Sequence, residues 1–251
     1  MSAVVASIGT THPWNIAGVG LDAHVAADYD VRHVQTIVAV SSQNAGGMRL
    51  VQAITPEAIA SQLTDMPPNL DAIRVGAIVG VPAIELVAAF LQRMPSRVAI
   101  VVDPVFTATL GGSFTDESTL AAFEARIATL PVVLTPNIDE ASVLLRRPVT
   151  AGNMEDAAAE ILARGARAVL LTGGHLEGDP TDVLAEDGAI ERFCEPRLPG
   201  NMRGTGCTLA MALACELARG RTLRAAVDSA RAFVRERIAA GVRIGDLHVA
   251  F

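Results

Sequence analysis

The sequence has few aromatic residues, few cysteines and no excess of positive charge. Aromatic residues make up 4% of its 251 residues, and Trp14 is the single tryptophan. With so few rings, helices and sheets must pack through small and branched aliphatic side chains. Hydrophobic residues still make up 51% of the chain, which is enough for a substantial core. The length fits one large α/β domain or two small ones, and we expect a single domain over residues 1–251.

The charge balance is acidic, with a net charge of -7 at pH 7. A surface for nucleic acid or for an anionic membrane needs a basic stripe, so the composition argues against both partners. No apolar run approaches the ~20 residues that cross a bilayer. The segment 1–14 lacks the basic region that begins an export signal. We therefore expect a cytoplasmic protein without membrane or nucleic-acid partners.

Three cysteines are present, at positions 194, 207 and 215. Their odd number and their spacing match neither a zinc site nor a thioredoxin motif. This pattern indicates a reducing compartment and no structural metal. Cys194 and Cys215 are expected to be small hydrophobic residues of the core.

Apolar runs that end in small polar loops alternate with helical segments along the chain. Strands are expected at 3–8, 34–40, 72–79 and 97–102, with further strands beginning at 131 and 168 and a hairpin around 186–188. Helices are expected at 19–29, 55–63, 82–92, 116–128, 151–163, 207–218 and 223–241, with a short one after Asn137. This alternation predicts an α/β fold of three layers around a mostly parallel sheet.

The segment Arg203–Thr208 is the strongest local signal, because small residues, a thiol and a helix start coincide there. In the turn Gly204-Thr205-Gly206, successive backbone N–H groups can point into one concavity. A helix N-terminus adds about half a positive charge, so an anion is expected there. Cys207 would border this anion, with its thiolate favoured by the same dipole. The alternative is an ordinary glycine-rich turn that caps a helix.

Other polar residues follow the ends of predicted strands, where open α/β sheets bind ligands. Asp103 ends an apolar strand and could organise a metal-bound phosphate, or simply occupy a turn. Asn137 and Glu140 have the spacing of a capping box, which explains both residues structurally, and the same geometry aims both at the ligand edge. The turn from Thr172 to Gly174 would allow close approach of a nucleotide phosphate.

Three more side chains lie near predicted strand ends at the start of the chain. Asp22 falls in the first turns of a helix, where it could be no more than a favourable charge. Gln43 and Asn44 offer both donors and acceptors to the edge of a heterocycle, although turn residues that satisfy the local backbone would look the same.

Four blocks carry a resemblance to a known family. They are Val101–Val105, Leu134–Ala141, Thr172–Gly178 and Gly204–Thr208, in that order. With them the chain resembles the ribokinase-like superfamily, and within it the hydroxymethylpyrimidine/phosphomethylpyrimidine kinases of thiamine biosynthesis. The resemblance covers nearly the full length and implies a three-layer α/β/α ribokinase-like fold with a central, mostly parallel sheet.

The resemblance implies transfer of the γ-phosphoryl group of ATP, with Mg²⁺, to the hydroxymethyl or phosphomethyl arm of a pyrimidine. It implies that Cys207 is the base and that Gly204, Thr205, Gly206 and the Cys207 amide form the anion hole. For the nucleotide side it implies Asn137 and Glu140 organising Mg²⁺ and phosphates through water, Asp103 supporting them, and Thr172 and Gly174 at the nucleotide turn. For the pyrimidine ring it implies Gly18, Asp22, Gln43 and Asn44. The superfamily often forms dimers, so a homodimer is expected.

The chain departs from the family pattern at several positions. In the first loop, Trp14, Asn15 and Ile16 replace a serine and two glycines of the family's Ser-Asp-Pro-Ser-Gly-Gly-Ala-Gly. Thr172 and Arg203 stand where the family has lysine and histidine. These changes affect the substrate loop more than the transfer apparatus. A pyridoxal kinase-like enzyme and a non-catalytic pyrimidine-binding homologue therefore remain alternatives.

Overall fold

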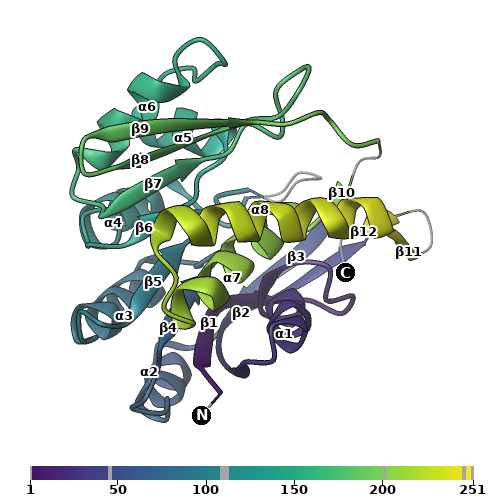
Figure 1. Ribbon diagram of the computed structural model, residues 1–251. Coiled ribbons are helices and arrows are strands. Elements are labelled where there is room, and N and C mark those ends of the chain that lie inside the picture. Colours follow the sequence, from purple (N-terminus) through teal and green to yellow (C-terminus); the bar gives the residue numbers. More distant parts are fainter. Residues whose placement is uncertain (1, 45–46, 108–112, 200–201, 245–246, 250–251) are drawn as a thin grey trace.

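One nine-stranded sheet runs through the computed structural model, which describes residues 2–44, 47–107, 113–199, 202–244 and 247–249 (Figure 1). In spatial order the strands are β3 (Gly47–Ala53), β2 (Arg32–Asn44), β1 (Val4–Thr11), β4 (Ala72–Val75), β5 (Ala99–Val102), β6 (Val133–Leu134), β7 (Ala168–Leu171), β8 (Thr181–Glu186) and β9 (Ala189–Cys194). The five pairs of neighbouring strands from β2 to β7 are parallel, while β3, β8 and β9 pair antiparallel with their neighbours.

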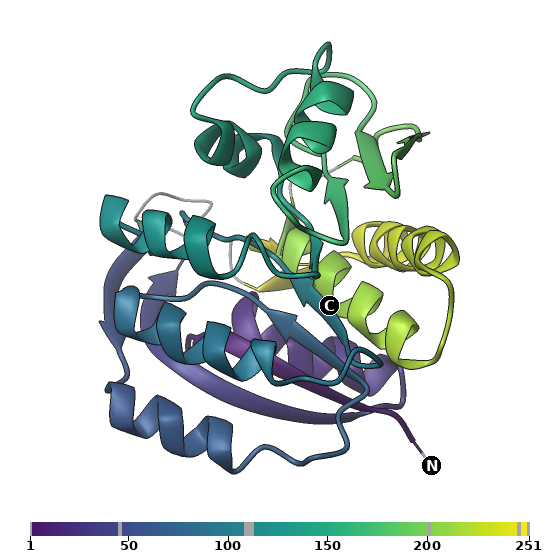
Figure 2. The same cartoon turned by 90° about the vertical axis from the view of Figure 1, so that its left-hand side faces the viewer.

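Helices cover both faces of this sheet, so the predicted three-layer α/β/α fold with a mostly parallel sheet is confirmed (Figure 2). One face carries α1 (Gly18–Asp28), α7 (Thr205–Ala218) and α8 (Leu223–Ala240). The other carries α2 (Pro56–Thr64), α3 (Val81–Gln92), α4 (Glu117–Arg126), α5 (Ile138–Leu145) and α6 (Met154–Leu162). A small second sheet consists of β10 (Met202–Arg203), β12 (Leu247–Val249) and β11 (Val242–Ile244).

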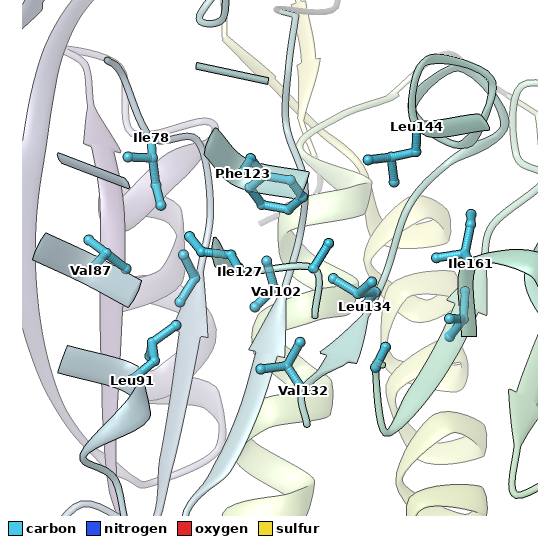
Figure 3. Packing of buried hydrophobic residues seen from close by; sticks show 14 of the residues in the cluster. Ile78, Val87, Leu91, Val102, Phe123, Ile127, Val132, Leu134, Leu144 and Ile161 are labelled. Carbon is cyan, nitrogen blue, oxygen red and sulfur yellow. The ribbon is translucent and has the colours of Figure 1, made fainter. Parts of the chain in front are cut away.

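The core has a separate hydrophobic cluster on each face of the sheet. Aliphatic side chains dominate the larger cluster, whose residues labelled in Figure 3 are Ile78, Val87, Leu91, Val102, Phe123, Ile127, Val132, Leu134, Leu144 and Ile161. On the other face, α7 is buried along the whole stretch 208–216, as expected of a helix enclosed by other elements on all sides. It packs against α1, α8, β4 and β5. This packing fixes the N-terminus of α7 under the middle of the sheet.

The predicted helix starts are largely those observed. Thr55 caps α2 by accepting from the Ala58 N–H at 3.4 Å, and Asp116 caps α4 by accepting from the Thr119 N–H at 2.8 Å. The sequence did not predict β3 or the small sheet. β3 is an edge strand whose residues are mostly exposed or half-buried, so it lacks the apolar run that marks the central strands.

None of the helices in the described ranges combines the length and the hydropathy needed to cross a membrane.

A half-buried histidine on β2, whose ring contacts β1, predicts sensitivity to acid. His33 Nε2 lies 2.9 Å from Ser7 Oγ, and burial lowers the pKa of His33 to about 4. Between about pH 6.5 and pH 4 the unfolded chain binds a proton at this residue that the folded chain does not, so stability falls as the pH falls. We expect a loss of about 2–3 kcal/mol from this residue.

Urea unfolding at pH 7.0 and pH 4.5 measures this loss. The His33→Gln variant should lose less stability than the wild type over the same interval. His24→Gln changes an exposed histidine on α1 and serves as the control. An unchanged pH dependence in His33→Gln would contradict the assignment.

Candidate active site

A cavity of about 490 Å³ opens along the edge of the sheet where the parallel strands end. It lies between the loops that follow β1, β5, β6 and β7 and the first turn of α7. Eleven residues singled out from the sequence line it: Gly18, Gln43, Asp103, Asn137, Glu140, Thr172, Gly174, Gly204, Thr205, Gly206 and Cys207. Asp22 does not line it, and the side chain of Asn44 lies outside the described part of the chain.

The first turn of α7 has the backbone geometry expected of an anion site. Gly204, the N-cap, has φ 83° and ψ 3°, and a Cβ there would lie 2.4 Å from the carbonyl oxygen of Ile16. Both facts require glycine at this position. Around a Cβ at Gly206, by contrast, no heavy atom lies within 4 Å. The first N–H groups of a helix have no partner within the helix, so those of Thr205, Gly206 and Cys207 are available to a ligand.

The thiol of Cys207 is half-buried at this turn, and its surroundings oppose ionisation. Burial raises the pKa of Cys207 to about 11; the guanidinium of Arg74 lowers it, while the carboxylates of Asp103 and Asp22 raise it. In the ligand-free protein, burial therefore outweighs the favourable effect that a helix N-terminus has on a thiolate. At neutral pH the thiol form dominates.

Arg74 connects this thiol to two carboxylates. It lies on β4 with no exposed surface, and its guanidinium donates to Asp22 Oδ2 at 3.2 Å and to Asp103 Oδ2 at 2.5 Å. Gly76 leaves room for this arrangement, because a Cβ there would lie 2.3 Å from Arg74 Nη1. Asp22 is thus held in the interior next to Arg74, and burial raises the pKa of Asp22 to about 6.

Asn137 and Glu140 form a complete capping box at the start of α5. The Asn137 side chain accepts from the Glu140 N–H at 2.9 Å, and Glu140 Oε2 accepts from the Asn137 N–H at 2.8 Å. Both residues also line the cavity. The role of the two residues in capping the helix is therefore compatible with a role in binding a ligand. Burial and the nearby carboxylate of Asp103 raise the pKa of Glu140.

An arginine that the sequence analysis did not select binds the backbone of the turn after β7. Arg197 donates to the carbonyl oxygens of Gly178 at 2.6 Å and Gly174 at 3.1 Å, and also to that of Leu176. No heavy atom lies within 4 Å of a Cβ built at Gly174, so this turn leaves space for a ligand beside its backbone. Nothing in the local sequence distinguishes Arg197 from the other arginines.

The opposite side of the cavity is formed by the loop after β1 and the end of β2. Gly18 has φ 63°, and a Cβ there would lie 2.2 Å from the carbonyl oxygen of Thr10. Its backbone N–H contacts the Cys207 thiol and lowers the pKa of that group. Gln43 donates from Nε2 to Ser41 Oγ at 3.0 Å, which leaves its amide oxygen for a ligand.

Two more basic residues lie in the cavity wall, His12, which the sequence analysis did not select, and Arg203, which stands where the family has histidine and could restore a charge on the phosphate side. His12 is 4% exposed, and its ring lies against the backbone of Ala17. Arg203 Nη1 is buried without a partner. The sequence held a signal for both, since Arg203 precedes the Gly-Thr-Gly turn and His12 lies in the loop that departs from the family pattern.

Comparison with known proteins gives a consistent result. Residues 14–251 match the model of a protein family described as phosphomethylpyrimidine kinase. A hydroxymethylpyrimidine/phosphomethylpyrimidine kinase of Rhizobium meliloti is 32% identical over 250 residues, which cover 97% of this chain and 93% of that protein. The thiamine biosynthetic bifunctional enzyme TH1 of Arabidopsis thaliana is 35% identical over 225 residues, which cover 87% of this chain and 43% of the enzyme. The chain therefore spans less than half of that bifunctional relative.

Among solved structures, the pyridoxal kinase from Staphylococcus aureus in complex with pyridoxal superposes with a TM-score of 0.90. The match covers 100% of this chain and 93% of that one, at 23% identity. At this identity the likeness establishes the fold.

Proposed function

Because this chain belongs to the phosphomethylpyrimidine kinase family, we propose that it transfers the γ-phosphoryl group of ATP to hydroxymethylpyrimidine, to its monophosphate, or to both. One observation carries the proposal: the N-terminal turn of α7 lies in a single cavity with Asn137 and Glu140 on one side and with Gly18 and Gln43 on the other. A donor and an acceptor can thus meet at one anion site.

In this proposal the backbone N–H groups of Thr205, Gly206 and Cys207 hold the transferred phosphoryl group. Phosphoryl transfer has a loose transition state, so alignment and charge stabilisation supply most of the rate. In the small fraction of molecules that carry the Cys207 thiolate, this sulfur takes the proton of an alcohol acceptor late, after the oxygen has begun to bond to phosphorus. Since the thiol form of Cys207 dominates at neutral pH, we assign the thiol a smaller share of catalysis than the backbone N–H groups.

The residues on the nucleotide side fit a hydrated Mg²⁺ ion. Among the described residues no cluster of three or more histidine, cysteine or acidic side chains could hold a metal directly. Mg²⁺ commonly keeps several waters and takes one or two carboxylates together with substrate phosphates. Asp103 and Glu140 are two such carboxylates, close enough for Asp103 to raise the pKa of Glu140. When bound, the ion supplies positive charge to the phosphates, while Asn137, Thr172 and Gly174 orient the nucleotide.

For the pyrimidine ring we propose contacts with Gln43, Asn44 and the backbone of Gly18. An amide both donates and accepts, which matches the edge of an aminopyrimidine. Asp22 was expected to contact the ring directly. We assign it to positioning instead, because it is wholly buried and its carboxylate pairs with Arg74.

A direct assay tests the proposed function. The purified protein is incubated with Mg²⁺ and ATP and, in separate reactions, with hydroxymethylpyrimidine, its monophosphate and pyridoxal, and ADP release and product masses are followed. Phosphorylation of either pyrimidine is the expected result. Phosphorylation of pyridoxal alone would move the chain to a pyridoxal kinase function. Tight ring binding without ADP release would make it a binding protein.

We also propose that residues 1–251 act as one domain and that two copies associate through the β2–β3 edge of the sheet. Val40 is 44% exposed and Leu50 is 58% exposed. The pairing of Val40 with Gln52 and of Ser42 with Leu50 places both apolar side chains on the same face of this edge. Exposed apolar residues on an edge strand favour association with another chain.

The substitution Leu50→Glu should convert the dimer to a monomer, because it buries an unpaired charge at the contact. Light scattering coupled to gel filtration measures the mass. Ile190→Glu, at an exposed apolar residue of β9 on the opposite edge, should leave the dimer intact. A monomeric wild type, or loss of the dimer only in Ile190→Glu, would contradict this interface.

A further inference from the structure

Arg197 binds the turn that follows β7 at four points. Its guanidinium donates to the carbonyl oxygens of Gly178 at 2.6 Å and Gly174 at 3.1 Å, and also to that of Leu176. Its backbone N–H donates to Asp179 Oδ1 at 3.0 Å. A planar guanidinium with five N–H donors can hold several acceptors in one fixed arrangement. A single residue thus determines the path of this turn.

Few other hydrogen bonds hold this part of the chain. Over residues 174–179, all of which the structure describes, the backbone makes one hydrogen bond to another backbone group, from the Leu176 N–H to the Gly173 carbonyl oxygen at 3.0 Å. His175 Nδ1 lies 2.8 Å from Asp139 Oδ2, but both side chains are more than half exposed, and exposed pairs contribute little. Without the guanidinium, the turn would therefore sample other conformations.

The start of the turn is anchored independently of Arg197. Asp182 Oδ1 accepts from the Gly173 N–H at 3.1 Å, and Asp182 Oδ2 accepts from Arg231 Nε at 2.8 Å. Both of these charged side chains are largely buried. A Cβ at Gly173 would lie 2.2 Å from the carbonyl oxygen of Thr181, so the chain passes close to β8 at this point. Loss of the Arg197 guanidinium should therefore affect the residues after Gly173 and leave the start of the turn in place.

The guanidinium of Arg197 also carries a charge that no carboxylate neutralises. It lines the cavity, and it has no ion pair with any residue that the structure describes. Two other arginines of the cavity wall, Arg231 and Arg235, are paired with Glu195 at 3.1 Å and 2.5 Å. Hydrogen bonds from a charged donor are about twice as strong as those between neutral groups. Three carbonyl oxygens, which would repel a phosphate, are thus bound by a positive group.

We propose that Arg197 is a positioning residue, which holds the turn 174–178 in the conformation that accepts the nucleotide and so lowers the Kd of the nucleotide. The inference rests on the proposed kinase function and adds a residue to its nucleotide side. The open space beside Gly174 belongs to the arrangement that Arg197 holds. If only a fraction of the molecules has the competent conformation, the apparent Kd rises by the inverse of that fraction. Saturating nucleotide should then restore the competent turn.

The acceptor side should not depend on Arg197. Three strands, β4, β5 and β6, separate β7 from β1 in the sheet, and the loop after β1 leads to Gly18. A change confined to the turn after β7 should therefore alter nucleotide binding and leave acceptor binding as it is.

Calorimetry with ADP and Mg²⁺, without any acceptor, measures the proposed effect. In Arg197→Gln the Kd of ADP should rise about 10-fold, the lower end for hydrogen bonds of a charged group, because the side chain is exposed to solvent. The KM of ATP should rise by a similar factor, while kcat at saturating ATP and the KM of the acceptor should change less than about twofold. Hydrogen exchange at the Leu176 amide should become faster.

Two further variants separate positioning from charge and from a general effect on the fold. Arg197→Lys keeps the charge but has one ammonium in place of the planar group, so its Kd for ADP should stay at least about 3-fold above that of the wild type. Full recovery in Arg197→Lys would overturn the positioning role. Arg192→Gln, at an exposed arginine of β9 that pairs with Glu155 outside the cavity, is the matched control and should leave the Kd unchanged. If Arg197→Gln does not fold, Arg197→Lys carries the same comparison.

The remaining outcomes distinguish this inference from the proposed function. An unchanged Kd of ADP in Arg197→Gln, or equal rises in the KM of ATP and of the acceptor, would overturn the role of Arg197 while the kinase function stands. If the wild type binds ADP but phosphorylates no pyrimidine, the proposed function fails, and the Kd values still decide the role of Arg197. If the wild type binds no ADP, both are wrong.

Discussion

Replacing Gly206 with proline is expected to lower kcat by about 100- to 1,000-fold, the usual effect of removing one donor that stabilises a developing anion. Gly206 is the second residue of α7, where the N–H has no acceptor within the helix. Proline is tolerated in the first turn of a helix, so the substitution removes this donor with little change to the helix. Steady-state rates measure the loss, and thermal unfolding shows whether the variant stays folded.

Gly206→Ala is the matched control, because it adds a Cβ and retains the N–H. In the ligand-free protein no heavy atom lies within 4 Å of that Cβ. The alanine variant should therefore be as stable as the wild type and should lose only a few-fold in kcat. Equal losses in the alanine and proline variants would show that the added carbon blocks the ligand, and the anion-hole assignment of this N–H would be wrong.

Cys207→Ala should cost less than Gly206→Pro. We expect a loss of about 10-fold with the alcohol acceptor, below the usual 100-fold or more for a general base, since the raised pKa of Cys207 leaves little thiolate at neutral pH. A larger loss in Cys207→Ala than in Gly206→Pro would reverse the proposed order of contributions.

The local features of this fold were predictable because neighbouring residues determine them. Apolar runs mark the buried strands, and Thr55 and Asn137 are caps in the structure as the sequence indicates. At Asn137 and Glu140 the two interpretations proved compatible, since one capping box both starts α5 and presents its side chains to the cavity. The periodicity of the sequence predicts the helix start, but it does not show which other parts of the chain face that start. It therefore cannot reveal that the capping residues also line a cavity.

The interior charges were not predictable in the same way. Arg74 is 52 residues from Asp22 and 29 from Asp103 in sequence, and only the sheet brings the three together. A basic residue within the apolar stretch 72–78 was visible, but its partners were not. Asp22 was accordingly expected at the ring, although its carboxylate faces Arg74. Similarly, only the fold brings the charge of Arg203 near enough to His12 to lower the pKa of its ring.

Replacing Arg74 with methionine is expected to lower the free energy of unfolding by about 3–5 kcal/mol, the usual cost of breaking a buried ion pair. Methionine has a similar length but no charge, so Asp22 and Asp103 would be left in the interior without their shared partner. Urea unfolding at pH 8 measures the loss, at a pH above the value of about 6 to which burial raises the pKa of Asp22. Arg74→Lys keeps the charge and should cost less.

A double-variant cycle with Asp22→Asn separates the effect on stability from the effect on catalysis. In Arg74→Met with Asp22→Asn, the most deeply buried carboxylate no longer carries a charge, so part of the stability should return, with a coupling free energy of about 1–3 kcal/mol. Additive losses would show that Arg74 and Asp22 do not depend on each other. We expect Arg74→Met to lower kcat as well, because Asp103 lines the cavity and loses the guanidinium that holds it. The kcat should stay low in the double variant, since Asp22→Asn does not restore that guanidinium. Recovery of stability without recovery of kcat would identify Arg74 as the residue that positions Asp103 for the reaction, whereas recovery of both would assign it to folding alone.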